Sequence, residues 1–352
     1  MRKTAVYRDD LFLEHQPGFD HVESPDRLQV IYDELDRRGP ASNLVYPHFS
    51  PASAEIIGLV HSPSLIRKVA ETAGKRQDFL DSDTRTSART YEAACLAAGS
   101  LIDGMQRIVN GEVDNAFCLV RPPGHHAEKN RAMGFCIFNN VAIAAAWALS
   151  CMGMERILIL DWDLHHGNGT QKSFYESKKV LYFSTHQYPL YPGTGTLLET
   201  GKGEGEGFTL NVPMPGGQGD QDFFRIFNDL LVPVARQYRP DFILVSCGFD
   251  IYGGDPLGTM RVTPAGFAGM TRIVQRLAAE ACQGRLLITL EGGYNLNGLR
   301  DGSLAVLTAL SGKKVGIDFP DFAEKGRGGS EKGDQPLYLK QAISLAKSYW
   351  KM

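Results

Sequence analysis

The segment RILILDWDLHHGNG, residues 156–169, changes abruptly from apolar to polar after Leu160. Its first five residues form a β-rich run without alternating polar side chains, which is typical of a strand covered on both faces. Asp161, Asp163 and His165 follow at a spacing of two, so in an extended chain their side chains point the same way. The segment therefore predicts a buried strand that presents carboxylate and imidazole groups at its carboxyl end.

Four further β-rich runs share this character and are separated by helical patterns. Because such alternation places helices on both faces of a parallel sheet, it predicts the α/β class. No internal repeat or low-complexity linker divides the chain, so we expect one domain over residues 1–352. The four runs span residues 115–120, 180–184, 241–246 and 285–290, and the main helical patterns span residues 87–109, 139–151, 222–238 and 264–281.

Each β-rich run passes directly into a segment rich in His, Asp, Gly or Tyr. In an open parallel sheet the carboxyl ends of the strands share one edge, where ligands bind, so we expect these segments to converge on one site. Asp250, after a different strand, is the natural third ligand beside Asp163 and His165. Two carboxylates and one imidazole can hold a divalent metal and leave coordination open for water and substrate, as catalytic zinc requires.

Other polar residues at this edge fit proton transfer and oxyanion stabilisation. His125 and His126 follow a Pro-Pro-Gly turn, and imidazole titrates near the working pH. Asp161 and Asn168 are the available partners for orienting these rings. Tyr294 follows two glycines, where a phenol can meet a developing oxyanion. Each residue also has a plain structural interpretation, because an Asp after a strand can cap a helix, a loop His can be incidental and Tyr294 can simply pack.

The overall composition argues against several classes of function. Lys and Arg number 37 against 40 Asp and Glu, a net charge of -3, so we expect neither nucleic acid nor an anionic membrane as a partner. The 6 cysteines form no C-x-x-C pair, which favours a reduced interior over a disulfide framework. No export signal is visible, and the longest apolar segment, residues 141–152, is too short to span a bilayer. We expect a cytoplasmic protein, and the sequence does not indicate its oligomeric state.

Nine motifs together resemble those of the histone deacetylase superfamily, which also contains acetylpolyamine amidohydrolases and acetoin-utilisation proteins. Asn168 and Trp162 make the chain similar to class II deacetylases and their bacterial relatives, since class I enzymes have Asp at the position of Asn168. The matching motifs are HVESPDR (21–27), RPPGHHA (121–127), GFCIFNN (134–140), DWDLHHGNGTQ (161–171), STHQ (184–187), YPGTG (191–195), GFD (248–250), DPLG (255–258) and EGGY (291–294).

The resemblance implies the arginase-deacetylase fold, a single α/β domain around a parallel sheet of about eight strands. It implies one zinc ion, with ferrous iron as an alternative, held by Asp163, His165 and Asp250. The catalytic residues that it implies are the histidine pair His125 and His126, their partners Asp161 and Asn168, and the oxyanion donor Tyr294.

The resemblance also implies a tunnel for an acyl-lysine side chain. Phe135 and Tyr191 would form its walls, with Gly134 in the same segment as Phe135. Leu257 would lie at its rim, and Asp83 would bind the substrate backbone. A structural potassium ion, by the same resemblance, would use Asp161, Asp163, His165, Ser184 and Thr185.

These residues together imply a zinc-dependent amidohydrolase that removes an acetyl or related acyl group from lysine in a protein or peptide. Acetylated polyamine is an alternative substrate, but apolar Leu257 stands where an acidic residue would favour a second cationic amine. A non-catalytic acyl-amide binder is a further alternative, although such proteins are expected to have lost a site residue. A two-manganese ureohydrolase needs additional carboxylates where this chain has Gly167 and Tyr252.

Overall fold

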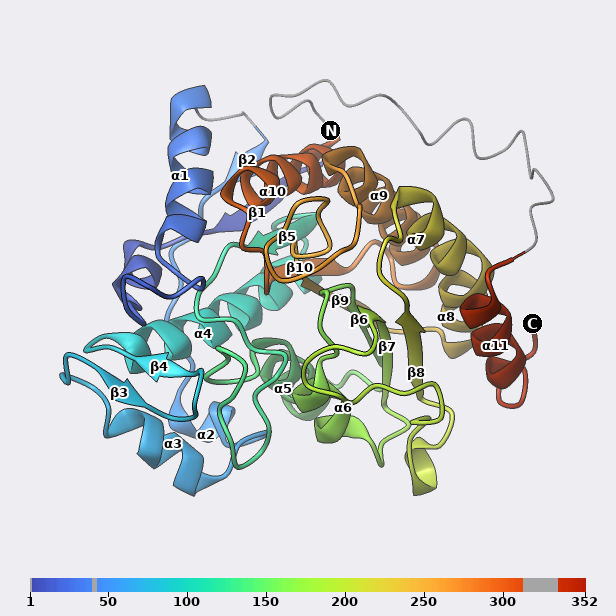
Figure 1. The fold of residues 1–352 in the computed structure, drawn as a ribbon, viewed down its shortest axis with the longest axis horizontal. Coiled ribbons are helices and arrows are strands. Elements are labelled where there is room, and N and C mark those ends of the chain that lie inside the picture. The colour runs from blue at the N-terminus through green and yellow to red at the C-terminus, as the bar shows by residue number, and fades with distance from the viewer. Residues whose placement is uncertain (1, 40–42, 313–334) are drawn as a thin grey trace.

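The computed structural model describes residues 2–39, 43–312 and 335–352. Within these residues the main sheet has eight strands in the order β2-β1-β5-β10-β9-β6-β7-β8, and every neighbouring pair is parallel (Figure 1). This confirms the predicted α/β class and the parallel sheet of about eight strands. The strands are β1 (Thr4–Tyr7), β2 (Leu44–Val45), β5 (Asn115–Cys118), β6 (Ile157–Asp161), β7 (Val180–Gln187), β8 (Thr209–Met214), β9 (Phe242–Cys247) and β10 (Leu286–Leu290).

Helices cover both faces of this sheet, as its apolar strands require (Figure 1). Helices α1, α7, α8, α9 and α10 form one layer, and α4, α5 and α6 form the other, while α11 lies beside the edge strand β8. The helices are α1 (Asp26–Arg38), α2 (Ala54–Ile57), α3 (Pro63–Ala70), α4 (Thr90–Val109), α5 (Asn140–Cys151), α6 (Asn168–Phe174), α7 (Asp220–Ile226), α8 (Val232–Tyr238), α9 (Pro264–Ala281), α10 (Leu296–Ser311) and α11 (Leu337–Ala346).

The hydrophobic core lies between the sheet and these two helix layers. Every residue of the central strands β6, β9 and β10 is buried, which explains why these runs lack polar alternation. Helix α9 begins at Pro264, and the Thr263 hydroxyl caps it by accepting from the Gly266 amide at 3.2 Å. The helix predicted over residues 222–238 begins two residues earlier, at Asp220, and consists of α7 and α8 joined by a π-helical segment, Phe227–Leu231.

Two shorter elements lie outside the main sheet. Strands β3 (Asp78–Phe79) and β4 (Arg85–Thr86) form a small antiparallel hairpin.

The apolar segment at residues 141–152 belongs to α5, a buried helix on one face of the sheet. Among the described residues, no helix combines the length and the apolar character needed to cross a membrane.

Candidate active site

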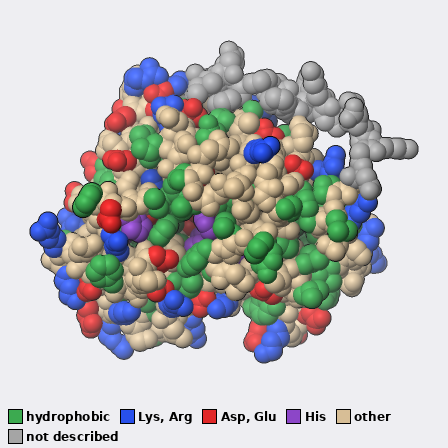
Figure 2. All heavy atoms as spheres, in the orientation of Figure 1, with side chains coloured by type: hydrophobic (Ala, Val, Ile, Leu, Met, Phe, Trp, Pro, Cys, Tyr) green, Lys and Arg blue, Asp and Glu red, His purple; other side chains and the backbone are tan. Residues whose placement is uncertain are grey.

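The predicted polar segments follow β5, β10, β9, β6 and β7, which are consecutive neighbours in the sheet. Because all five strands are parallel, the segments meet at one edge of the sheet, as open α/β folds require of a ligand site. Histidine side chains are visible at this face in an opening between hydrophobic side chains (Figure 2). The site is therefore partly enclosed and open on one side.

Asp163, His165 and Asp250 form a compact cluster at this edge. Their side chains offer ligand atoms that all lie within 4.8 Å of one another, and all three residues are buried. The Nδ1 atom of His165 lies 3.2 Å from Asp163 Oδ1 and 3.1 Å from Asp250 Oδ2. Two carboxylates and one imidazole around one point are a donor set suited to a divalent ion such as zinc.

Two glycines make room for this cluster. A Cβ atom on Gly248 would lie 2.2 Å from Asp163 Oδ2, and one on Gly292 would lie 2.3 Å from Asp250 Oδ2. The Gly292 amide donates to Asp163 Oδ2 at 2.8 Å, and the Leu164 amide donates to Asp250 Oδ1 at 2.9 Å. The carboxylates are therefore fixed by backbone donors, while Asp163 Oδ1 and Asp250 Oδ2 both lie beside His165 Nδ1, an arrangement that fits one divalent ion.

Gly167 is the position where a ureohydrolase would need a further carboxylate. A Cβ atom there would lie 2.3 Å from Asp161 Oδ2 and 2.6 Å from the Tyr182 hydroxyl. No side chain can be accommodated at this position without displacing Asp161, which fits a site for one ion and not two.

His125 is buried beside two carboxylates. Its Nδ1 atom lies 3.1 Å from Asp161 Oδ2, and its Nε2 atom lies 3.7 Å from Asp163 Oδ1. Burial alone would lower the pKa of His125, but the charges of Asp163 and Asp161 outweigh burial and raise this pKa to about 10. His125 is therefore a cationic imidazole at neutral pH.

His126 has a different partner. Its Nδ1 atom lies 2.8 Å from Asn168 Oδ1, while the Asn168 amide nitrogen donates to Glu128 Oε1 at 2.6 Å. Because the amide oxygen can only accept, Nδ1 of His126 carries a proton and Nε2 is left with a free lone pair. Burial, together with the charges of His125 and His165, lowers the pKa of His126 well below its usual range. His126 is a neutral imidazole that can accept a proton.

Aromatic side chains flank these histidines. Tyr191 meets the His126 ring edge-on, with ring centroids 5.0 Å apart, and lies 6.2 Å from the His165 ring. Gly134 packs directly against His126, since a Cβ atom there would lie 2.5 Å from the imidazole. Phe135 follows Gly134 and is partly exposed. The structure thus places Gly134 and Tyr191 against His126, and the tunnel that they would form with Phe135 stays a prediction.

Asp83 lies beside the segment of Gly134 and Phe135 and is partly exposed. Its Oδ1 atom accepts from the Gly134 amide at 3.3 Å and from the Thr84 hydroxyl at 2.9 Å. The Thr84 hydroxyl also accepts from the Phe135 amide at 3.2 Å. Asp83 therefore contacts the wall segment directly, and its predicted contact with a substrate backbone stays a prediction.

Tyr294 packs between Phe135 and Arg27. Its ring meets Phe135 edge-on at 5.9 Å, and the Arg27 guanidinium lies 4.9 Å from its centroid. Burial and the nearby carboxylates of Asp250 and Asp163 raise the pKa of the Tyr294 phenol well above its usual value. The phenol stays protonated at neutral pH and can donate a hydrogen bond.

Asp255 connects Tyr294 with the predicted rim residue Leu257. Its Oδ2 atom accepts from the Tyr294 amide at 2.7 Å, and its Oδ1 atom accepts from the Leu257 amide at 3.0 Å. Leu257 is partly buried and packs on the hydrophobic core. The link between these two loops through Asp255 was not predicted from the sequence.

The residues predicted for a potassium site lie at the end of β6, in the segment that follows it and within the neighbouring strand β7. Asp161 pairs with Ser184 across the two strands, and the Thr185 hydroxyl lies 3.5 Å from the Asp161 carbonyl. The Ser184 hydroxyl lies 2.9 Å from His186 Nδ1. All five residues, Asp161, Asp163, His165, Ser184 and Thr185, are buried.

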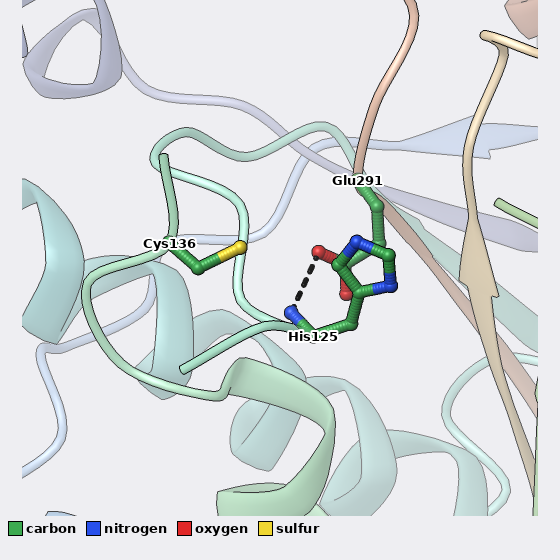
Figure 3. A group of neighbouring side chains, drawn as sticks. All are labelled: His125, Cys136 and Glu291. Carbon is green, nitrogen blue, oxygen red and sulfur yellow. Dashed lines mark hydrogen bonds between the residues drawn. The ribbon is translucent and has the colours of Figure 1, made fainter. Parts of the chain in front are cut away.

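A second group of potential ligands consists of His125, Cys136 and Glu291, with the Glu291 carboxylate directed at the backbone of His125 (Figure 3). Glu291 Oε2 accepts from the amides of Gly124 at 2.7 Å and His125 at 3.2 Å, and Oε1 accepts from Ser246 at 3.0 Å. Cys136 Sγ accepts from the His126 amide at 3.5 Å, and burial raises the pKa of its thiol well above the usual value. These bonds fix the backbone of the histidine pair, which is a structural role.

A buried ionic group that was not predicted supports the Tyr294 loop. Arg27 donates to the carbonyls of Gly293 at 2.7 Å and Glu291 at 2.6 Å, and to Glu23 Oε1 at 3.0 Å. Arg121 forms two hydrogen bonds with the Glu23 carboxylate. Glu23 and Arg27 lie within the quoted HVESPDR motif and Arg121 begins RPPGHHA, so the motifs marked them without indicating their partners.

The Glu23→Ala variant should be strongly destabilised. It leaves two buried guanidinium groups without their carboxylate, and breaking such a pair typically costs about 3–5 kcal/mol. The free energy of unfolding, measured with urea, should fall by that amount, while the control Glu14→Ala at an exposed carboxylate should stay near wild type. Equal stability of the two variants would contradict this role for Glu23.

Comparison with known proteins agrees with this geometry. The family model of the histone deacetylase domain matches residues 21–310. A protein named "Probable deacetylase" from Archaeoglobus fulgidus is 39% identical over 312 residues, covering 88% of this chain and 86% of its own length. "Histone deacetylase 5" from Arabidopsis thaliana is 40% identical over 327 residues, covering 88% of this chain but 49% of its own length, so the chain spans about half of that relative.

The fold agrees as well. The crystal structure of the HDA15 HD domain superposes with a TM-score of 0.88 at 36% identity, covering 99% of this chain and 95% of that one. The sheet order and the match over residues 21–310 define the arginase-deacetylase fold. The chain belongs to the histone deacetylase superfamily, and the names of its relatives support a deacetylase activity.

Proposed function

We propose that this protein is a metal-dependent deacetylase that hydrolyses the amide of an acyl-lysine side chain. The observation that carries the proposal is the juxtaposition of the Asp163, His165 and Asp250 cluster with two histidines that have different partners, His125 beside the Asp161 carboxylate and His126 beside the Asn168 amide. The rings of Phe135 and Tyr191, which pack against Tyr294 and His126, would line a channel for the slim aliphatic stem of the lysine. Zinc is the ion that we propose for the cluster, with ferrous iron as an alternative, and Asp161, Ser184 and Thr185 would contribute to a potassium site.

The chain's own residues divide the remaining chemistry. Bound zinc would supply Lewis-acid polarisation of the amide carbonyl and would acidify a water molecule. Nε2 of neutral His126 takes the proton of the attacking water and later returns it to the amine leaving group. The Tyr294 hydroxyl donates a hydrogen bond to the tetrahedral oxyanion, and the positive charge of His125 stabilises the developing negative charge. Phe135 and Tyr191 orient the lysine stem and limit access of bulk water.

The experiment that tests the substrate is a panel of acetyl-lysine peptides, longer acyl-lysine peptides and acetylated polyamines, assayed side by side. Hydrolysis of the peptides with the larger kcat/KM supports the proposal, because apolar Leu257 offers no charge for a polyamine. A larger kcat/KM on acetylpolyamines would replace lysine by polyamine in the same mechanism. No hydrolysis of any amide would support a non-catalytic binder.

The Asn168→Asp variant should shift the acidic limb of the pH profile of kcat/KM to higher pH. A carboxylate beside Nδ1 favours the imidazolium form, so the pKa of His126 rises above its lowered value. Because the base must be neutral, activity is then lost earlier as the pH falls. Glu128→Gln is the comparison variant, and it should shift the acidic limb less, since it keeps a hydrogen-bond acceptor for the Asn168 amide. An unmoved acidic limb would mean that it reports another group.

A further inference from the structure

A second set of polar side chains lies beside the site and has no part in the chemistry described above. Its members are His166, Gln171, His186, Glu199 and Asn211, and they come from the loop after β6, from α6, from β7, from the β7–β8 loop and from β8. All except the partly exposed Glu199 are buried, so their hydrogen bonds carry a high cost if broken.

Glu199 ties its own loop to α6. Its Oε1 atom accepts from the amides of Gly195 at 3.0 Å and Thr196 at 2.9 Å. Its Oε2 atom accepts from the Gln171 side chain at 2.6 Å, and Gln171 Oε1 in turn accepts from Asn211 Nδ2 at 2.7 Å. One carboxylate thus joins the backbone of the loop to both α6 and β8.

The two histidines hold the same segment from the other side. His166 Nε2 lies 2.9 Å from Gln171 Oε1, which can only accept, so His166 Nδ1 accepts from the Thr194 hydroxyl at 2.8 Å. His186 Nε2 donates to the Gly195 carbonyl at 2.9 Å. A Cβ atom on Gly195, where φ is 85°, would lie 2.5 Å from the His166 ring and 2.6 Å from His186. The segment therefore packs against both rings without space to move toward them.

These hydrogen bonds fix the segment of residues 194–196, which follows Tyr191 in the chain. Tyr191 itself lies in a tight turn of residues 190–193, which the Gly193 amide closes by donating to the Leu190 carbonyl at 2.8 Å. The Tyr191 side chain is 39% exposed, and its ring packs edge-on against His126 and His165. Its position therefore depends on the backbone that carries it. We propose that Glu199 is a positioning residue that holds Tyr191 in place and thereby sets the acyl-chain selectivity of the tunnel; this rests on the proposed deacetylase function.

The kinetic test compares Glu199→Ala with wild type on acetyl-, butyryl- and hexanoyl-lysine peptides. The KM for the acetyl peptide should rise roughly tenfold with kcat nearly unchanged, because a misplaced wall weakens stem binding and leaves the reacting groups intact. The ratio of kcat/KM for hexanoyl over acetyl should rise, since a displaced Tyr191 widens the tunnel. Equal losses on all three peptides would overturn the proposal.

The matched control is Glu204→Gln, which alters an exposed carboxylate of the same loop that pairs with Lys178. It should behave as wild type on all three peptides. A double-mutant cycle then separates positioning from general damage. In a Tyr191→Ala background, Glu199→Ala should change kcat/KM by less than about twofold, because the wall that it positions is gone. If Glu199→Ala lowers kcat/KM by the same factor in the Tyr191→Ala background as in wild type, the two substitutions act independently and the proposal is overturned.

Hydrogen exchange tests the positioning without reference to activity. Glu199→Gln keeps the side-chain shape but places an amide nitrogen against a donor, either the Gln171 amide nitrogen or the backbone amides of Gly195 and Thr196, so it serves also if Glu199→Ala does not fold. Amides of residues 190–196 should exchange faster in the variant, and those of β6 should not. Unchanged exchange at residues 190–196 would overturn the proposal. If the wild-type protein hydrolyses no peptide, but the amides of residues 190–196 exchange faster in Glu199→Gln, the proposed function fails and the role of Glu199 in positioning Tyr191 stands.

Discussion

The His126→Ala variant should lose nearly all turnover on acyl-lysine, about 10²–10⁴ in kcat. His126 is the neutral imidazole of the pair, with Nδ1 bonded to the amide oxygen of Asn168 at 2.8 Å and Nε2 free to accept a proton. Removing it leaves the attacking water without a base and the leaving amine without an acid. Steady-state kinetics measure the loss, and metal content and circular dichroism verify that the site and the fold are intact.

His125→Ala is the matched comparison, because the two rings lie side by side with centroids 4.0 Å apart. Asp163 and Asp161 keep His125 cationic, so it stabilises negative charge without carrying the transferred proton. We expect this variant to retain measurable activity, clearly above that of His126→Ala. A His126→Ala enzyme that is more active than His125→Ala would reverse the two roles.

The Tyr294→Phe variant should lower kcat by about 10²–10³, the usual effect of removing one oxyanion donor, or about 2.7–4 kcal/mol. The substitution removes only the hydroxyl, since a phenyl ring keeps the edge-on contact with Phe135 and the contact with the Arg27 guanidinium. Metal content and melting temperature should therefore match wild type. An unchanged kcat would mean that Tyr294 only packs between these two side chains.

Much of the fold could be predicted because its central strands are buried on both faces. The apolar runs at residues 156–160, 241–246 and 285–290 correspond closely to β6, β9 and β10. The strands that were not predicted lie toward the sheet edges: β1 and β2 are short, and β8 contains Asn211 and Pro213, which weaken its strand pattern. Their pairing depends on tertiary packing that a local pattern does not express.

The predicted metal ligands and the histidine pair follow the carboxyl ends of strands, so sheet topology brings them together, whereas Asp83, Gly134, Phe135, Tyr191 and Leu257 lie elsewhere on loops and were indicated only by the family resemblance. The supporting residues have no such signal. Glu128 reaches Asn168, and Glu199 reaches Gln171 across 28 positions of sequence, only because loops fold back onto α6. Glu23 and Arg121 are 98 positions apart, and their burial could not be inferred from charged residues in a motif. Spacing reveals groups on one strand but not partners on different loops.

The most direct test of the account is a metal titration of the purified protein stripped with a chelator, with metal content and hydrolysis of an acetyl-lysine peptide measured on the same samples. Zinc, and in an anaerobic series ferrous iron, should restore activity in proportion to occupancy and reach a plateau at one ion per chain. The variant that replaces Asp163, His165 and Asp250 by alanine should neither bind the ion stoichiometrically nor recover activity. Stoichiometric metal in that variant, or full activity of the stripped wild-type protein, would contradict the account.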